Sequence, residues 1–410
     1  MDRREFLVSS VSAGALASVP ISDEASQKFL ADLDEAAAAP VLEKKFFTSP
    51  VKIASIELLK NKRYYFLRTR SADGAEGISV PSDRVAYLFP ILQRLVVPFF
   101  IGKDARELDS LVDGVYVYQS NYKMSSLALW CCVAWVEFSI LDMLGKIAGK
   151  PVGDLLGGVV RREVPIYAAS GNRGNTAEEE VAVLQRLVEQ TGAKALKFKV
   201  GGRMSNNADS LPGRSEKLIA LARKTFGDGF TLYADSNGSY DVPKAIEIGK
   251  LLEDQQYAFF EEPCPFDHLE ETKEVADALR IPIAGGEQES SAWRFRWMIG
   301  RGAIRVVQPD LHYYGGFVRA TRVARMAARA GLTLTLHLSG GLGYADMVHF
   351  ASYVPNMGPY QEYKGDVPET GEWFDPPVRL ENGALSVPAT PGFGFRKDLG
   401  ELERAKPFAS

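Results

Sequence analysis

The sequence predicts an α/β protein in which an α+β domain precedes a parallel barrel of alternating strands and helices. From about residue 163 onward, eight short apolar runs alternate with stretches of helical periodicity, which is typical of such a barrel. Before them, residues 50–68 alternate like a β-hairpin, and residues 81–113 and 123–147 carry apolar positions at helical spacing. The length of 410 residues suits two domains and a tail.

Composition excludes several kinds of partner. The formal net charge is −4 with both signs mixed along the chain, so no basic stripe is present for nucleic acid. The longest apolar run, residues 127–141, contains Glu137 and is shorter than the roughly 18 residues of a membrane span, so it predicts a buried helix. We therefore expect neither nucleic acid nor membrane as a partner. Three cysteines give no disulfide framework.

The first twenty residues predict an export signal. Arg3 and Arg4 precede Phe6, Leu7 and a weakly apolar stretch of small residues, a pattern similar to a twin-arginine signal. A charged N-terminus without a targeting role is the alternative. The first interpretation predicts a periplasmic protein with a linker at residues 21–45, and the second predicts a cytoplasmic protein.

Each predicted barrel strand ends in or near a residue that can take part in chemistry. The runs cover residues 164–170, 195–200, 231–237, 257–263, 281–287, 304–310, 332–337 and 359–363. From the second run onward, the residues are Lys199, Asp235, Glu261, Glu287, Asp310, His337 and Glu362. From Asp235 they follow one another at intervals of 23 to 27 residues, which is the length of one strand–helix unit. Because the C-terminal ends of barrel strands open onto one face, this spacing predicts a ring of functional side chains.

Asp235, Glu261 and Glu287 predict a metal site. Three carboxylates directed at one place repel one another and lose hydration, at a cost of several kcal/mol per ion. A hard divalent cation relieves this repulsion, and ligands that are all oxygen favour one Mg²⁺ per chain, or Mn²⁺, over Zn²⁺. Helix capping is the alternative role, but it explains one acid better than three at 26-residue spacing.

Acid–base chemistry is predicted on both sides of this site. Lys197 and Lys199 lie two positions apart on a strand, so both side chains face the barrel interior. Neighbouring ammonium groups and a nearby cation lower a lysine pKa, which makes it a base near neutral pH. Asp310 ends the sixth run and His337 the seventh, so the carboxylate can fix the imidazole tautomer. His312 is the weaker rival.

Together these motifs resemble the enolase superfamily, whose three metal carboxylates end the third, fourth and fifth barrel strands. Asp235 in YADSN, Glu261 in FFEEP and Glu287 in GGEQ match those positions, and the resemblance covers about residues 50–395. A KxK on the second strand, with Asp on the sixth and His on the seventh, is similar to the mandelate racemase subgroup.

The resemblance implies a modified TIM barrel of the (β/α)7β type under an α+β capping domain. The implied boundaries are 1–45 for signal and linker, 46–160 for the capping domain, 161–375 for the barrel and 376–410 for a tail that packs on the capping domain. The family is also often oligomeric, so we expect a homo-oligomer.

The resemblance also implies a role for each residue. Lys199 would be the base on one face of the substrate, with His337 and Asp310 acting on the opposite face. Lys197 would hold the substrate carboxylate, and a protonated Glu362 would donate a hydrogen bond to the enolate oxygen.

Three further residues are candidates for substrate contacts. Asn237 matches a family position that contacts a substrate hydroxyl or carboxylate. Arg203 lies in an insertion at residues 201–217, and Tyr118 begins a tyrosine-containing segment of the first domain that could close over the site. A solvated loop is the alternative for the insertion.

These residues predict an enzyme that removes the proton next to the carboxylate of a small anionic substrate. Loss of a β-hydroxyl from a sugar acid or hydroxy acid is the preferred outcome, because sugar-acid dehydratases are numerous in the subgroup. Racemisation or epimerisation and cycloisomerisation use the same apparatus and remain open. A catalytically silent barrel that only binds a partner is the remote alternative.

Overall fold

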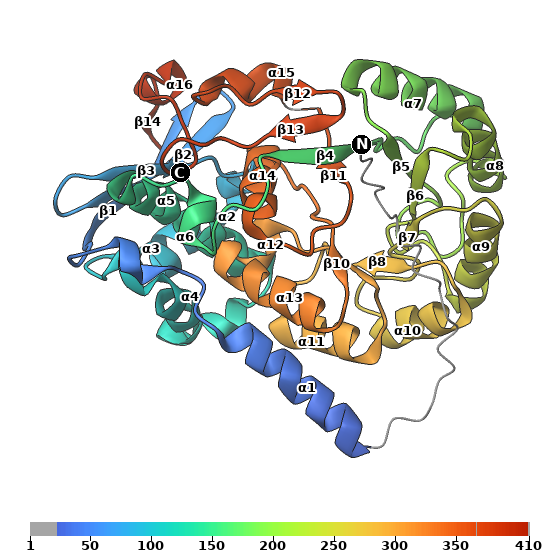
Figure 1. Cartoon of the computed structure of the whole chain (residues 1–410), viewed down its shortest axis with the longest axis horizontal. Helices are drawn as coiled ribbons and strands as arrows, with labels where there is room; N and C mark the ends of the chain where they lie inside the picture. Colours follow the sequence, from blue (N-terminus) through green and yellow to red (C-terminus); the bar gives the residue numbers. More distant parts are fainter. Residues whose placement is uncertain (1–22, 366, 409–410) are drawn as a thin grey trace, which may run out of the picture.

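The computed structural model describes residues 23–365 and 367–408. The predicted export signal in the first twenty residues lies outside the described residues. Figure 1 shows two parts side by side: the N-terminal elements on the left, and a barrel surrounded by helices on the right. The predicted fold class, an α+β capping domain with a (β/α)7β barrel, is confirmed.

The capping domain is a small antiparallel sheet covered by helices. Strands β1 (Ile53–Asn61), β2 (Tyr64–Ser71) and β3 (Glu76–Ser79) form a meander, and β14 (Lys406–Pro407) from the C-terminal end pairs with β1. The helices are α2 (Val85–Ile91), α3 (Val97–Phe100), α4 (Leu108–Val117) and α5 (Leu127–Ala148). Among the described residues, α5 alone is long and apolar enough to cross a membrane, but it is buried over most of its length against the sheet.

Eight parallel strands form the barrel; seven lie within the predicted runs, and β4 begins one residue before the first run. They are β4 (Glu163–Ala169), β5 (Ala195–Lys199), β6 (Thr231–Asp235), β7 (Phe259–Glu261), β8 (Ile283–Gly285), β9 (Val306–Val307), β10 (Thr333–Leu334) and β11 (Gln361–Tyr363). Strands β4 to β10 pair in chain order, and β11 pairs with β4. Between β10 and β11, the Gln361 side chain accepts a hydrogen bond from the Leu336 amide.

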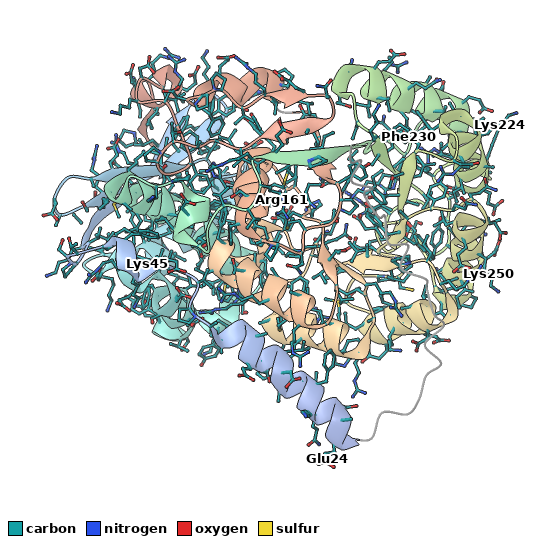
Figure 2. All side chains as sticks on the ribbon, in the orientation of Figure 1. Glu24, Lys45, Arg161, Lys224, Phe230 and Lys250 are labelled. Carbon is teal, nitrogen blue, oxygen red and sulfur yellow. The ribbon has the colours of Figure 1, made fainter. Side chains whose placement is uncertain are left out.

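Helices surround the barrel on its outer side. They are α7 (Ala177–Thr191), α8 (Arg214–Phe226), α9 (Val242–Asp254), α10 (Leu269–Ala278), α11 (Ala292–Arg301), α13 (Phe317–Arg329) and α14 (Gly343–Tyr353). Figure 2 shows Lys224 of α8 and Lys250 of α9 at the outer rim, whereas Arg161 lies between the two parts. Arg161 donates to the carbonyls of Val354 and Pro355, which ties the start of the barrel to the end of α14.

An aromatic layer closes the barrel interior below the polar strand ends. Side chains alternate along a strand, so Tyr233 shares the inward face of Asp235, and Phe259 shares that of Glu261. The rings of Tyr233 and Phe259 are stacked with centroids 3.9 Å apart, and Tyr167 packs edge-on against Tyr233. An aromatic layer therefore lies directly below the charged side chains, which are confined to the open end of the barrel.

Residues 23–38 form a helix in the region where we expected a linker. Helix α1 (Asp23–Ala38) packs against α13 and α11, as the lower part of Figure 1 shows. Its alanine-rich sequence has high helix propensity, and Leu33 is fully buried. An ion pair of 2.6 Å between Asp34 and Arg296 adds a polar contact.

The C-terminal tail contacts both parts of the molecule. Strand β13 (Ala384–Ser386) pairs with β4 of the barrel and with β12 (Leu380–Glu381), whereas β14 joins the capping sheet. The Phe408 ring packs edge-on against Tyr65 and Phe89 of the capping domain. The sequence predicted contact with the capping domain alone.

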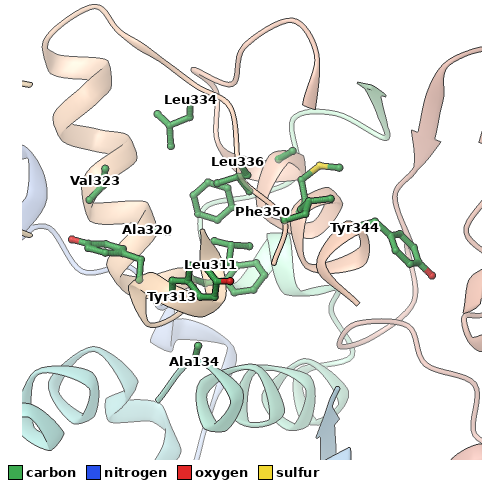
Figure 3. Close-up of a cluster of buried hydrophobic side chains, with 14 of the residues drawn as sticks. Ala134, Leu311, Tyr313, Ala320, Val323, Leu334, Leu336, Tyr344 and Phe350 are labelled. Carbon is green, nitrogen blue, oxygen red and sulfur yellow. The ribbon is translucent and has the colours of Figure 1, made fainter. Parts of the chain in front are cut away.

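An apolar interface joins the capping domain to the barrel. Figure 3 shows Ala134 of α5 facing Leu311 and Tyr313 of the short helix α12 (Leu311–Tyr314), with Leu336 and Phe350 above them in this view. Burial of apolar surface stabilises a contact roughly in proportion to the area buried. The two parts are therefore expected to hold a fixed relative position.

Glu137 of α5 is a fully buried acid at this interface. One of its oxygens accepts a hydrogen bond of 3.0 Å from the Val318 amide at the start of α13. Gly316 has a φ of 103°, and a Cβ there would lie 2.5 Å from the Glu137 carboxyl, so only glycine permits this approach. Burial raises the pKa of Glu137 to about 8.

We expect Glu137→Gln to change the pH dependence of stability. Because the pKa of Glu137 rises from 4.5 to about 8 on folding, its contribution to stability is full below 4.5 and is lost as pH rises through about 8. The variant should therefore gain a few kcal/mol relative to the native protein between about pH 4.5 and pH 8. Urea unfolding of both proteins across this range measures the difference, and a difference independent of pH would contradict the assignment.

Candidate active site

The three predicted metal ligands converge at the open end of the barrel. Asp235 ends β6, Glu261 ends β7 and Glu287 follows β8 by two residues. Oxygens of the three carboxylates lie within 4.8 Å of one another, and all three residues are buried. Adjacent parallel strands produce this convergence, since Asp235 and Glu261 are register partners. The structure brings Glu261, and not its neighbour Glu262, into the trio.

The two lysines of KxK lie against these carboxylates. Lys197 donates to both oxygens of Glu261 at 2.8 Å, and Lys199 forms an ion pair with Asp235. Burial favours the neutral form of Lys197, but the charges of Glu261 and Glu362 hold its pKa well above the usual range. For Lys197 this direction is opposite to our expectation, because the carboxylates around it outweigh the repulsion from the neighbouring ammonium group.

The trio retains more negative charge than the lysines neutralise. Burial and the neighbouring charge of Asp235 raise the pKa of Glu261 to about 8, although Lys197 opposes this rise. For Glu287, the Oε2 atom accepts no hydrogen bond from any described residue. Buried, unpartnered carboxylate oxygen is costly unless a cation binds it. A donor set of carboxylate oxygens alone fits a hard divalent cation.

His337 lies opposite the lysines and is held by Asp310. The His337 Nδ1 atom is 2.7 Å from Asp310 Oδ2, and its Nε2 atom is 3.6 Å from Glu287 Oε2. Burial favours the protonated acid, but the hydrogen bond and charge of His337 lower the pKa of Asp310. Backbone amides of His312 and Tyr313 donate to the other Asp310 oxygen and fix its orientation.

Lys364 is a residue of the site that our sequence analysis missed. Its Nζ atom is 3.2 Å from His337 Nε2, 2.9 Å from Glu362 Oε2 and 2.6 Å from the Leu338 carbonyl oxygen. Because an ammonium group only donates, it assigns the proton of a neutral His337 to Nδ1. Lys364 lies two residues beyond Glu362, just past the end of the last strand, so the same-face rule that identified Lys197 and Lys199 could have found it.

The charges around Glu362 favour its ionised form over the protonated form that we expected. The carboxyl is buried, which favours the acid, but Lys197, Lys364 and His337 hold its pKa well below the usual range. The Lys197 Nζ atom is 2.9 Å from Glu362 Oε1. Glu362 is therefore a carboxylate that positions two ammonium groups. Lys364, which we had not considered, supplies the additional positive charge.

His312, the weaker rival, is outside the site. The Trp135 indole donates to its Nδ1 atom at 2.9 Å, and its Nε2 atom is 3.0 Å from Asp346 Oδ2. Since Nδ1 accepts a hydrogen bond, the imidazole is neutral and carries its proton on Nε2. His312 thus links the capping domain to the barrel.

Asn237 and Arg203 lie at the cavity above the trio. This cavity has a volume of about 590 Å³, and its lining includes both residues together with Glu287 and His337. The Asn237 Oδ1 atom accepts a hydrogen bond of 2.7 Å from Arg173, a residue of the loop after β4 that we had not predicted. The Arg203 guanidinium is 3.5 Å from the same oxygen.

Tyr118 is not brought to this cavity, which corrects our prediction. Its ring packs on Phe99 at 5.3 Å. Gln119 and Ser120 have positive φ angles, and the Asn121 side chain donates to the carbonyls of Leu95 and Val115. These contacts hold the turn on the capping domain. Instead, the capping domain contributes Arg84 to the cavity lining, and no spacing or motif in the sequence pointed to it.

Fold and site together define a barrel enzyme whose buried carboxylates can hold a cation between a lysine and a histidine. Residues 179–401 match the family described as enolase C-terminal domain-like. The chain therefore belongs to the enolase superfamily, in its mandelate racemase and muconate lactonizing branch.

Individual relatives agree with this placement. A crystal structure from Roseobacter denitrificans, provisionally described as a racemase, is 35% identical with a TM-score of 0.81, over 88% of this chain and 99% of that one. A mandelate racemase/muconate lactonizing protein from Paracoccus denitrificans, complexed with magnesium, is 26% identical with a TM-score of 0.80 over the same shares. Arabinonate dehydratase of Saccharolobus solfataricus is 28% identical over 77% of this chain and 82% of its own.

Proposed function

We propose that the protein is a Mg²⁺-dependent dehydratase of a sugar acid. The observation that carries the proposal is the placement of Lys199 and the His337–Asp310 pair on either side of the trio formed by Asp235, Glu261 and Glu287. The likeness to arabinonate dehydratase supports the choice of a sugar acid as substrate.

The trio would hold the Mg²⁺ ion, with Mn²⁺ as a substitute. The likeness to a magnesium-bound relative supports this choice. Bound there, Mg²⁺ would act as a Lewis acid that stabilises negative charge on a substrate carboxylate. Lys197 would support the same charge as a buried ammonium group.

Two side chains of the protein, Lys199 and His337, would each carry out one of the two proton transfers. Lys199, once neutral, takes the proton from the carbon next to the carboxylate, at the side of the barrel formed by β5. On the opposite side, His337 Nε2 would deliver a proton to the departing β-hydroxyl, and Asp310 would stabilise the imidazolium form through Nδ1. The Lys364 ammonium donates to Nε2 in the structure, so it must give up this hydrogen bond when Nε2 carries the proton.

Racemisation or epimerisation is the second candidate function. Groups able to exchange a proton stand on both sides of the trio, so the proton removed by Lys199 could be replaced from the His337 side. The likeness to a protein provisionally described as a racemase supports this candidate.

A screen of sugar acids separates these functions. With Mg²⁺, we expect a 2-keto-3-deoxy acid from at least one aldonate or aldarate, detectable with semicarbazide. Removal of the cation with EDTA should abolish turnover, and added Mg²⁺ should restore it. An epimer without a keto acid would favour the second candidate. Binding of acids without turnover or proton exchange in D₂O would favour a silent barrel.

We further propose that the protein reaches the periplasm by twin-arginine export and forms a homo-oligomer. Arg3 and Arg4 with the following small residues support export. Cell fractionation of the native chain and of a form with both arginines changed to lysine tests the route, and an unchanged distribution would contradict it. Light scattering with size-exclusion chromatography tests the oligomer.

A further inference from the structure

Arg84 lies where the active-site cavity meets a second cavity. The active-site cavity and a neighbouring cavity of about 360 Å³ are both lined by Arg84, Ser339 and Gly340. The Arg84 guanidinium lies 4.9 Å from the centre of the Tyr313 ring. Among the described residues, no carboxylate forms an ion pair with Arg84, and its guanidinium makes no hydrogen bond. An uncompensated cation thus faces the space beyond the trio.

Unused hydrogen-bond donors line the second cavity together with this guanidinium. Among the described residues, the backbone amides of Ser339, Gly340 and Gly341 donate to no partner. The loop they form precedes helix α14, whose N-terminus has no side-chain cap. The positive end of a helix dipole and free amide groups both favour an anion. Gly341 is required there, because a Cβ would lie 2.6 Å from the Val80 carbonyl oxygen.

Ser82 is a second, independent indication of a missing ligand. Its side chain is only 2% exposed, lines the second cavity, and its hydroxyl has no hydrogen-bond partner. Buried polar groups are usually hydrogen-bonded, so an unpartnered hydroxyl beside an unpaired guanidinium points to an occupant with oxygen atoms.

Neighbouring acids do not neutralise Arg84. Glu369, which lines the second cavity, forms an ion pair with Arg63. Asp83 is exposed to solvent. The positive charge of Arg84 is therefore available to a ligand, and it amounts to a single unit.

We infer that Arg84, Ser82 and the amides of residues 339–341 bind a second carboxylate, at the end of the substrate remote from the trio. The preferred substrate is then a sugar acid with a carboxylate at both ends. This inference rests on the proposed function and narrows its substrate class. One guanidinium matches the single charge of a carboxylate, whereas a phosphate would bring nearly two charges to a site with one cation.

Paired ligands test the inference. Each hexarate is compared with the hexonate of the same configuration, which carries a hydroxymethyl group in place of the second carboxylate. Calorimetric titration into the Mg²⁺-loaded Lys199→Met chain measures affinity without turnover. We expect the diacid of the best pair to bind roughly 10- to 100-fold more tightly than its monoacid, the range for a charge-assisted hydrogen bond.

Two variants test whether Arg84 causes the preference for the diacid. Arg84→Gln should reduce the diacid-to-monoacid affinity ratio to about one. Lys224→Gln, which removes an exposed positive charge on the outer rim of α8 and leaves Glu369 paired with Arg63, should leave the ratio unchanged. Equal affinities in the parent chain, a ratio unaffected by Arg84→Gln, tighter binding of the 6-phospho monoacid, or no binding of any diacid would each overturn the inference.

Failure of this inference is distinguishable from failure of the proposed function. Turnover of monoacids by the native chain, without any preference for diacids, would overturn the role of Arg84 and leave the dehydratase in place. Selective diacid binding that depends on Arg84, without turnover by the native chain, would support the carboxylate site and contradict the dehydratase.

Discussion

Changing Lys199 to methionine is expected to reduce kcat by roughly 10⁴-fold, the upper range for loss of a general base. Methionine has a similar length but no basic nitrogen, so the proton next to the substrate carboxylate has no acceptor on that side. The loss should appear in kcat and not in KM, because Lys197 and the trio still bind the carboxylate. Steady-state kinetics with the acid found in the screen measures both constants.

A matched control distinguishes loss of the catalytic base from loss of a positive charge elsewhere on the protein. Lys224→Met removes an exposed lysine on the outer rim of α8, far from the strand ends, and should leave kcat unchanged. Proton exchange between substrate and D₂O should also be lost in Lys199→Met. A variant that retains more than about a tenth of native kcat would exclude Lys199 as the base.

Changing His337 to asparagine should separate the two half-reactions. Without the imidazole, proton delivery to the departing hydroxyl is lost, and we expect product formation to fall by roughly 10³- to 10⁴-fold. Lys199 remains, so exchange of the substrate proton with D₂O should continue. Mass spectrometry of recovered substrate measures the exchange, and a keto-acid assay measures the product.

The opposite result would reassign the roles. Loss of both exchange and product in His337→Asn, with exchange retained in Lys199→Met, would make His337 the base that removes the proton. His268→Asn is the control, because the His268 side chain is half exposed and pairs with Glu271 outside the site.

Much of the barrel and its metal site was predictable because both follow from a periodic pattern. Each apolar run had to be buried, and its last polar residue had to lie at the open end. Asp235, Glu261 and Glu287 therefore converge for the same reason that β6, β7 and β8 are adjacent and parallel. The pairing of His337 with Asp310 follows from the neighbouring sixth and seventh strand ends.

Features that depend on contacts between distant segments were not predictable. Arg84 reaches the cavity only because the capping domain docks on the loop at residues 339–341, and nothing near Arg84 in the sequence signals this contact. Tyr118 is held away by a turn whose two positive φ angles fall on ordinary residues, Gln119 and Ser120. The lowered pKa of Glu362 reflects the charges of Lys197 and Lys364, and the role of Lys364 appears only when the ring of charges is assembled.

The central claim is that Asp235, Glu261 and Glu287 together bind one divalent cation at the open end of the barrel. Anomalous diffraction from crystals soaked in Mn²⁺ tests it most directly. We expect one strong peak per chain, with an oxygen of each of the three carboxylates at roughly 2.0–2.2 Å, close to the octahedral Mg²⁺ distance. A peak elsewhere, or one that any of the three acids does not touch, would contradict the claim and the chemistry derived from it.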